Sequence, residues 1–246
     1  MPELPAEIRD LVDVLASMSG AVAVVLGGSR ALGTATPGSD WDLGVYYRGK
    51  LDTAALAHFG VVHLPGSWGR VMNGGAWLTV ANAKVDVLFR DLDAVEHWSG
   101  RASEGEFEID ALLGYLAGVP TYSLLAERAV AVPLRRALPD AGAYPRKLRE
   151  AGLSRWHYHS QFSFEHARMR AERGDVTGTT GHVAKALVEE AHARLCRRGH
   201  WVLNEKGILE AANLHQAQGW FAAIPTTSDA LVQWVATVRA GLALGT

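Results

Sequence analysis

The chain has 246 residues, of which 48% are hydrophobic and 20% charged, as is typical of a globular protein with one large domain or two small ones. Its net charge of −2 offers no general basic field for nucleic acid, and its single cysteine, Cys196, excludes a disulfide framework or a thiolate zinc cluster. The acidic N-terminal segment MPELPAEIRD lacks the apolar core of a signal peptide, and no apolar run could span a bilayer. We therefore expect a cytoplasmic protein with no membrane partner.

Strands dominate the first part of the sequence. Apolar residues at helical spacing predict a helix over residues 5–18, and the apolar run AVAVVL predicts a buried strand over 21–26. A turn at Gly27-Gly28 leads into a short helix at 29–33. The pattern then predicts a strand at 41–47, a helix at 52–59, and two strands at 76–80 and 84–89 joined by the turn 81–83.

Helices dominate the rest. Residues 91–105 are polar and predict a connector that starts with a short helix. Helices are then predicted at about 107–117, 120–137, 143–173, 178–198, 204–212 and 228–241. The sequence therefore predicts an α+β protein: a mixed β-sheet domain flanked by helices over residues 1–105, followed by an α-helical bundle domain over 106–246.

The turn Gly27-Gly28-Ser29 follows the first predicted strand and opens a helix. Glycines let a backbone approach a ligand closely, and the free N–H groups at the start of a helix favour an anion. The serine hydroxyl can add another donor. The same residues also form ordinary tight turns, so this feature alone does not distinguish a phosphate site from a simple turn.

Two aspartates stand at alternate positions near the start of the second predicted strand. Asp40 and Asp42 would point to the same face with their Cα atoms about 6.5–7 Å apart, while Trp41 and Leu43 point into the core. Their mutual repulsion is relieved if a hard divalent cation lies between them. A solvated acidic edge is the simpler alternative for such a pair.

Asp86 lies within the apolar strand KVDVLF, where a carboxylate is costly unless it has a partner. If this strand neighbours the strand of Asp40 and Asp42, the carboxylates converge. Three carboxylates can hold two Mg²⁺ ions, and such a site supports in-line displacement at phosphorus. Asp86 could also accept the proton of the attacking hydroxyl.

The order Gly27-Gly28-Ser29, then Ser39-Asp40-Trp41-Asp42, then Asp86, resembles the signature of the DNA-polymerase-β-like nucleotidyltransferase superfamily. The string GSRALGTATPGSDWDL is similar to the small-molecule branch, which includes aminoglycoside and lincosamide antibiotic adenylyltransferases. The resemblance covers roughly residues 20–90. The helical half is similar in layout to the helical domain of those enzymes.

This resemblance implies a nucleotidyltransferase fold in the N-terminal domain and a role for each motif residue. The carboxylates implied to bind two Mg²⁺ ions and to serve catalysis are Asp40, Asp42 and Asp86. The residues implied to contact the nucleoside triphosphate are Gly28, Ser29 and Ser39. The third carboxylate varies within the family, either binding the acceptor-side metal or acting as base.

The helical half offers candidates to complete the site. Lys185 is the expected triphosphate contact, with Lys206 as a second candidate; a lysine with its charged end in solvent is the alternative. The aromatic and titratable residues between Trp156 and Glu165 line either an acceptor pocket or, more commonly for such residues, the helical core.

The sequence predicts a Mg²⁺-dependent enzyme that transfers a nucleoside monophosphate, by default AMP from ATP, to a hydroxyl of a small molecule, with an aminoglycoside-like antibiotic as one candidate. Transfer to tRNA or protein is a second hypothesis, although the chain has few basic stretches. An inactive nucleotide-binding protein is a third. The glycines fit neither a dinucleotide-binding G-x-G-x-x-G motif nor a Walker A loop.

Overall fold

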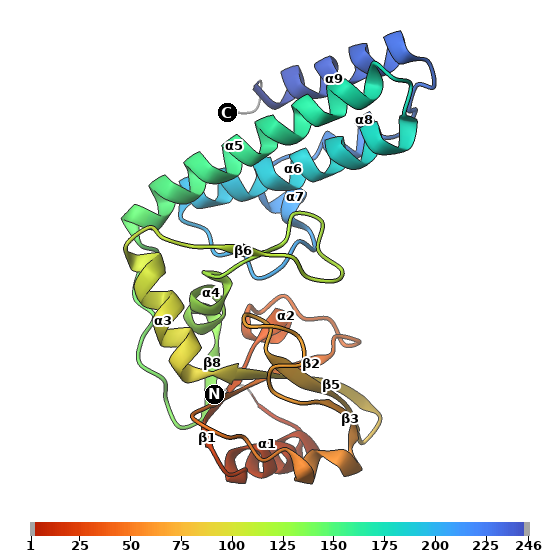
Figure 1. The fold of residues 1–246 in the computed structure, drawn as a ribbon. Helices are drawn as coiled ribbons and strands as arrows, with labels where there is room; N and C mark the ends of the chain where they lie inside the picture. The colour runs from red at the N-terminus through yellow and green to blue at the C-terminus, as the bar shows by residue number, and fades with distance from the viewer. Residues whose placement is uncertain (1–2, 244–246) are drawn as a thin grey trace. The chain divides into compact units, whose positions relative to one another are not determined.

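The computed structural model describes residues 3–243, and the chain forms two compact units (Figure 1). The first, called here the sheet unit, comprises the chain up to Arg101 together with Thr121–Ala143. The second, called the helical unit, comprises Ala102–Pro120 and the chain from Tyr144 onward. The sheet unit is therefore built from two separate stretches of sequence.

The sheet unit contains a six-stranded mixed sheet in the order β3-β4-β5-β2-β1-β8. Its strands are β1 (Ala21–Leu26), β2 (Trp41–Tyr47), β3 (Gly60–His63), β4 (Gly74–Val80), β5 (Ala83–Asp91) and β8 (Val132–Arg135). The β2 and β5 strands pair in parallel, and the other neighbouring pairs are antiparallel. The parallel pair lies in the middle of the sheet.

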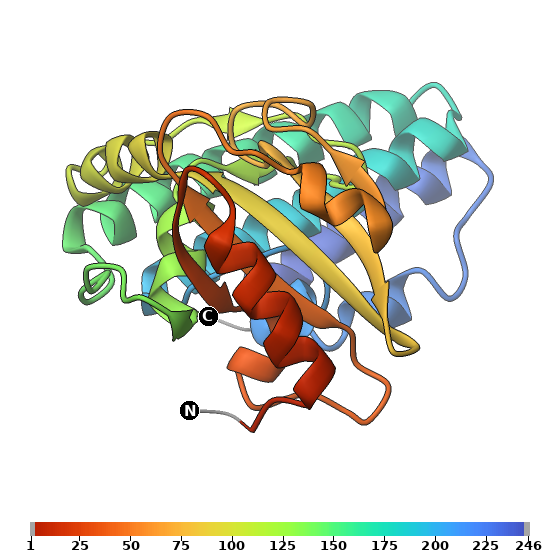
Figure 2. The ribbon, with the colours of Figure 1, turned by 90° about the horizontal axis from the view of Figure 1, so that it is seen from below.

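Helix α1 (Ala6–Ser17) covers one face of this sheet, as Figure 2 shows where it crosses in front of the strands. Its apolar side chains recur at helical spacing and join a core with alternate residues of the strands. In β5 the core residues are Val85, Val87 and Phe89. Because side chains alternate along a strand, Asp86 points to the opposite face.

On that opposite face, helix α4 (Ser123–Val130) contributes Glu127 to an ion pair with Arg90. The guanidinium is only 1% exposed, and its Nε and Nη2 donate to the two carboxylate oxygens at 2.6 and 2.7 Å. Burial, followed by the charge of Glu127, raises the pKa of the nearby Tyr46 hydroxyl. Helix α4 thus covers this face near the C-terminal ends of β2 and β5, whereas Asp42 and Asp86 lie toward the N-terminal ends of these strands.

Three further helices complete the sheet unit or lead out of it. Helix α2 (Gly28–Ala31) follows β1, and the 3-10 helix η1 (Ala54–His58) follows β2. Helix α3 (Leu92–Ser103) continues from β5 and extends into the first residues of the helical unit.

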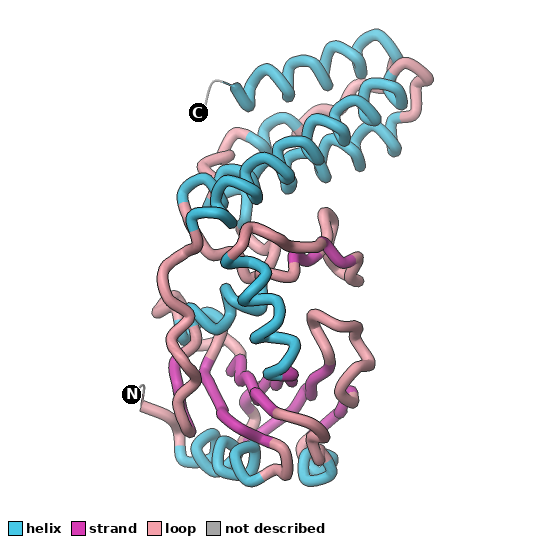
Figure 3. The backbone as a smooth tube through the Cα atoms, turned by 60° about the vertical axis from the view of Figure 1, so that its left-hand side comes forward, coloured by secondary structure: helices cyan, strands magenta, loops and turns pink. Residues whose placement is uncertain are grey.

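The helical unit is formed mainly by three long helices, which lie side by side in Figure 3: α5 (Arg146–Ala171), α6 (Val176–Arg198) and α9 (Ser228–Ala243). The shorter elements are α7 (Ile208–Ala211), α8 (Ala217–Trp220) and the paired strands β6 (Ile109–Asp110) and β7 (Val119–Pro120). Over residues 3–243, no helix combines the length and apolar character that crossing a bilayer needs.

The predicted fold class is confirmed: a mixed sheet with helices precedes a helical region. The predicted strands at 21–26 and 41–47 have the observed bounds, and the helix predicted at 52–59 is the shorter 3-10 helix. The polar stretch 91–105 contains the twelve-residue helix α3 rather than a short one.

Two of the predicted helices are wrong. Residues 107–117 form strand β6 and turns, and residues 120–137 form a short helix followed by β8. Pro133 removes a donor and would break a helix, but it is tolerated in β8 because that strand lies at the sheet edge. The units also group 121–143 with the sheet, whereas the sequence analysis placed these residues in the helical domain. As a division into domains, 1–105 and 106–246 stays a prediction.

Candidate active site

The turn after β1 is fitted closely around Asp42. Leu26 pairs with Leu43, and the next N–H, that of Gly27, donates to the Asp42 carbonyl oxygen at 2.8 Å. Gly28 has a φ of +58°, and a Cβ placed there would lie 1.8 Å from Oδ2 of Asp42. The carboxylate therefore occupies the space that any side chain at position 28 would need.

Asp42 and Asp86 are register partners in the parallel pair of β2 and β5. Both side chains are partly buried and lie on the face away from α1, because their sequence neighbours Leu43 and Val85 are in the core. The parallel pairing therefore brings these two residues together on one surface, and it meets the condition that the sequence analysis set for their convergence. Their role in a site stays a prediction.

Asp40 precedes β2 and is exposed. The pKa of Asp86 is raised above its ordinary value, first by burial and then by the negative charge of Asp40, while Lys84 lowers it. The electrostatic effect of Asp40 on Asp86 indicates that Asp40 lies in the same region as the pair Asp42 and Asp86. A divalent cation would favour the ionised form of these groups, and carboxylate oxygens are the ligands that Mg²⁺ prefers.

In residues 3–243, no group of three or more His, Cys, Asp or Glu side chains is gathered closely enough to hold a metal ion. The chemistry of the carboxylate donors nevertheless fits a divalent cation. Asp40 and Asp86 repel each other, and Asp42 is the register partner of Asp86. A cation would turn this repulsion into attraction.

Arg30 connects the two halves of the motif, and the sequence analysis did not identify it. Its Nη2 donates to the Ser39 carbonyl at 2.6 Å, and its Nε donates to the Asp40 carbonyl at 3.1 Å. The guanidinium also lies 4.0 Å from the ring centroid of Trp41. Arg30 thus holds the backbone at the start of β2 against α2. The feature of the sequence that could have pointed to Arg30 is its position directly after Gly27-Gly28-Ser29.

The two serines of the motif lie on the segments that these contacts join. The Ser39 hydroxyl accepts the Thr36 N–H at 2.9 Å, and its carbonyl is held by Arg30. The Ser29 carbonyl accepts the Thr34 N–H at 2.9 Å. These bonds give Ser39 a part in shaping its own turn. Contact of either serine with a phosphate stays a prediction.

Lys185 lies on α6 of the helical unit and already has an acidic partner. Its Nζ donates to Glu189 at 2.7 Å, and the Ser163 hydroxyl donates to the other carboxylate oxygen at 2.6 Å. Glu189 is only 1% exposed, so the lysine neutralises a buried charge within its own helix. Contact of Lys185 with a triphosphate stays a prediction.

The aromatic stretch on α5 divides between interior and surface. Trp156 and Phe164 are buried, whereas Tyr158 and Phe162 are 66% and 55% exposed. Glu165 pairs with Arg239 and Arg168, which lower the pKa of its carboxyl group in that order of effect. Core packing therefore accounts for only part of this stretch.

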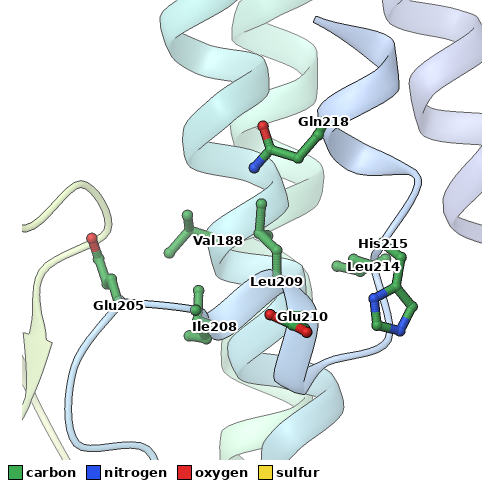
Figure 4. A pocket seen from close by; sticks show the side chains of 9 residues that line it. Val188, Glu205, Ile208, Leu209, Glu210, Leu214, His215 and Gln218 are labelled. Atoms are coloured by element: carbon green, nitrogen blue, oxygen red, sulfur yellow. The ribbon is translucent and has the colours of Figure 1, made fainter. Parts of the chain in front are cut away.

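A pocket of about 380 Å³ lies within the helical unit around α7 (Figure 4). The side chains of Val188, Ile208 and Leu214 line it, together with the polar groups of His215 and Gln218. Another lining residue, Glu205, accepts the backbone N–H groups of Leu116 and Ala117, each at 2.7 Å. None of the predicted site residues lines this pocket.

A substitution at position 28 tests the close fit around Asp42. Gly28→Ala is expected to displace the Asp42 carboxylate, because the new Cβ would lie 1.8 Å from Oδ2, and to strain a backbone at a φ of +58°. We expect the activity that depends on this site to fall at least about a hundredfold and the free energy of unfolding by about 1 kcal/mol. Steady-state rates and urea denaturation measure the two effects. The control is Gly33→Ala, which has a similar φ of +71° but no atom within 4 Å of the added carbon.

Equal losses of activity in both variants would show that backbone strain, and not the displaced carboxylate, causes the effect.

Comparison with known proteins gives a domain match. Residues 8–92 match the family model for a nucleotidyltransferase domain. A nucleotidyltransferase-like protein from Exiguobacterium sibiricum 255-15 has a similar fold, with a TM-score of 0.50 and 12% identity over 97% of this chain and 74% of that chain. An aminoglycoside 6-adenyltransferase from Bacillus subtilis aligns over 98% of this chain and 92% of that chain, but its TM-score of 0.30 and 7% identity carry no argument. Comparison with curated proteins gave no match.

Proposed function

Since residues 8–92 match the family model for a nucleotidyltransferase domain, we propose that the chain transfers AMP from ATP to a hydroxyl of a small-molecule acceptor in a Mg²⁺-dependent reaction. One observation carries this proposal. Asp42 and Asp86 are register partners on the sheet face opposite α1, with the Gly28 turn packed against Asp42 and the charge of Asp40 acting on Asp86.

In the proposed reaction, the acceptor oxygen forms a bond to the α-phosphorus of ATP, and the bond from that phosphorus to pyrophosphate breaks. Asp86 accepts the proton of the acceptor hydroxyl, a role that suits a carboxylate whose pKa is raised by burial and by Asp40. Asp40, Asp42 and Asp86 would hold Mg²⁺, which stabilises negative charge on the phosphoryl oxygens. Because Gly28 has no side chain, the Asp42 carboxylate can occupy the space next to it.

Further residues complete the proposed binding of ATP. The triphosphate would be contacted from the turn by Gly28 and Ser29, and from the residue before Asp40 by Ser39. Arg30 holds these two segments together through its hydrogen bonds to the carbonyls of Ser39 and Asp40. Lys185 would add a positive charge, which requires it to leave Glu189 or to bridge Glu189 and a phosphate. The carboxylates and the triphosphate are both negatively charged, so cations are needed to offset their repulsion.

The acceptor is proposed to be a small molecule, with an aminoglycoside-like antibiotic as a candidate. A net charge of −2 supports a small or cationic acceptor more than a nucleic acid. Transfer to tRNA or a protein side chain is the alternative for the same chemistry. A cytoplasmic location is also proposed, and the single buried thiol of Cys196 is compatible with it.

The first test measures binding of the donor. Isothermal titration with ATP, GTP, CTP and UTP, each with and without Mg²⁺, is expected to show Mg²⁺-dependent binding with ATP preferred. Asp40→Asn is expected to weaken this binding at least about tenfold. The matched control is Asp10→Asn, an exposed aspartate on α1, which lies on the other face of the sheet. Failure of all four triphosphates to bind with Mg²⁺ would contradict the proposal.

The raised pKa of Asp86 predicts a pH-dependent effect on stability. In the folded protein burial and Asp40 favour the protonated carboxyl group, so ionising Asp86 as pH rises through its raised pKa lowers stability. Asp86→Asn is therefore expected to raise the melting temperature in EDTA at pH 7 by about 2 °C, and to have little effect below the ordinary pKa of 3.8. The same variant is expected to lose nucleotidyl transfer. Calorimetric melting at a series of pH values checks the prediction.

A variant that is less stable than the parent chain at pH 7 in EDTA would contradict this account of Asp86.

A further inference from the structure

An aromatic cluster lies beside the carboxylates on the same face of the sheet. Trp77 of β4 is the register partner of Asp86 in β5. Its neighbours Ala76 and Leu78 are in the core, so Trp77 points to the face that carries Asp86 and Asp42. Directly paired residues have Cβ atoms about 4.5–5.5 Å apart, so the two side chains start from adjoining positions on this face.

The sheet order separates this cluster from the Gly28 turn. Going from β1 through β2 and β5 to β4, the same face presents the turn, then Asp42, then Asp86, then Trp77. The indole thus lies on the far side of Asp86 from the residues proposed to contact the triphosphate. In the proposed reaction that far side is where an acceptor hydroxyl would approach Asp86.

Two further rings fix the orientation of the Trp77 indole. His63 contacts it edge-on at a centroid distance of 4.5 Å and an angle of 70°, and Trp68 lies 5.6 Å away. His63 and Trp68 are themselves 4.9 Å apart. Trp68 lies over Gly75, where an added Cβ would be 2.8 Å from its ring. The three rings therefore support one another.

Despite this support, the Trp77 side chain is 53% exposed. A large aromatic side chain that is ordered by its neighbours but open to solvent is suited to stacking against a ring of a ligand. The electron-rich face of an indole attracts C–H groups and cations. Asp86, in the adjoining position, can accept a hydrogen bond from a hydroxyl on the same ring.

We propose that Trp77, oriented by His63 and Trp68, is the surface on which a hydroxyl-bearing ring of the acceptor stacks. This inference rests on the proposed function, because that function assigns Asp86 to the acceptor hydroxyl. A ring that stacks on the indole through its C–H face carries hydroxyls at its edge, next to the position of Asp86. A linear polyol lacks such a face and binds weakly.

The test uses saturation-transfer NMR with methyl α-D-glucopyranoside as the ring probe and glycerol as a hydroxylated probe without a ring. Both are added to protein with Mg²⁺ and the non-reactive ATP analogue α,β-methylene-ATP. The parent chain is expected to transfer saturation to the ring probe and not to glycerol. Trp77→Ala is expected to reduce the ring-probe signal about tenfold, and Trp77→Phe to retain most of it.

Two controls make the result specific. Leu113→Ala removes a 97% exposed apolar side chain of the helical unit and is expected to leave the ring-probe signal unchanged. Titration of ATP with Mg²⁺ is expected to give the same affinity for Trp77→Ala as for the parent chain, within about twofold.

The failures of the two proposals are distinguishable. A full ring-probe signal in Trp77→Ala, or equal signals from glycerol and the ring probe, with normal binding of ATP, would overturn the stacking surface and leave the proposed function intact. Loss of ATP affinity in Trp77→Ala would assign the indole to the nucleotide base and also overturn it. Absence of ATP binding by the parent chain would overturn the proposed function, and the acceptor assignment with it.

Discussion

Replacing Asp42 by asparagine is expected to reduce the rate of nucleotidyl transfer at least about a thousandfold while leaving the sheet unit folded. Asparagine has nearly the same shape, so it fits the space beside Gly28 where an added Cβ would lie 1.8 Å from the carboxylate oxygen. What it removes is a negative charge opposite Asp86. A change of charge without a change of packing separates chemistry from stability.

The measurement is the release of pyrophosphate from ATP with an accepting ring compound, together with melting temperatures in EDTA. Asp10→Asn on α1 serves as the control for the substitution itself, since that aspartate is exposed on the other side of the sheet. We expect the control to keep its rate within about twofold and the Asp42 variant to melt near the parent temperature. Turnover by Asp42→Asn at the parent rate would be incompatible with a carboxylate-bound metal in this site.

The largest expected effect on stability comes from the opposite end of the same face. Glu127→Ala is expected to lower the free energy of unfolding by about 3 kcal/mol, because it leaves the buried guanidinium of Arg90 without its carboxylate. The Arg90 side chain is 1% exposed, and its Nη1 also donates to the carbonyl oxygens of Met72 at 2.9 Å and Phe89 at 3.3 Å. Neutral carbonyl oxygens do not supply the negative charge that balances a buried guanidinium.

Urea denaturation measures this effect, and a double variant provides the control. Replacing both Arg90 and Glu127 by methionine removes the charge together with its partner, so it is expected to recover most of the lost stability. If Glu127→Ala and the double variant were equally unstable, lost packing by α4, and not the unpaired charge, would be the cause. A loss below about 1 kcal/mol for Glu127→Ala would show that solvent already screens the pair.

Local patterns in the sequence were sufficient for the strands that hold the site. The run AVAVVL is bounded by glycines, and the alternation in the second strand places Leu43 inside and Asp42 outside. The pairing of Asp42 with Asp86 is different, because it depends on a parallel contact between strands separated by a hairpin. The sequence alone could not show that the two strands are neighbours, so the convergence of the carboxylates stayed conditional on that pairing.

The register of Trp77 depends on a turn that the sequence analysis placed at 81–83, one residue too long. The structure has a two-residue turn at Ala81-Asn82, where both residues have positive φ, and such a tight turn fixes the register of β4 and β5. Counting outward from it pairs Trp77 with Asp86. Arg30 offered less, since its bonds to the carbonyls of Ser39 and Asp40 depend on a loop conformation that no periodicity encodes.

The two-part composition of the sheet unit has a consequence for its folding during synthesis. Strand β8 and the carboxylate of Glu127 come from Thr121–Ala143, so β1 lacks one strand neighbour and Arg90 lacks its carboxylate until this stretch has left the ribosome. Meanwhile, the segment Ala102–Pro120 emerges before the long helices of its own unit. A nascent chain of which only residues up to about 105 have left the ribosome would thus expose the edge of β1, with Arg90 still lacking Glu127, and would be a substrate for chaperones.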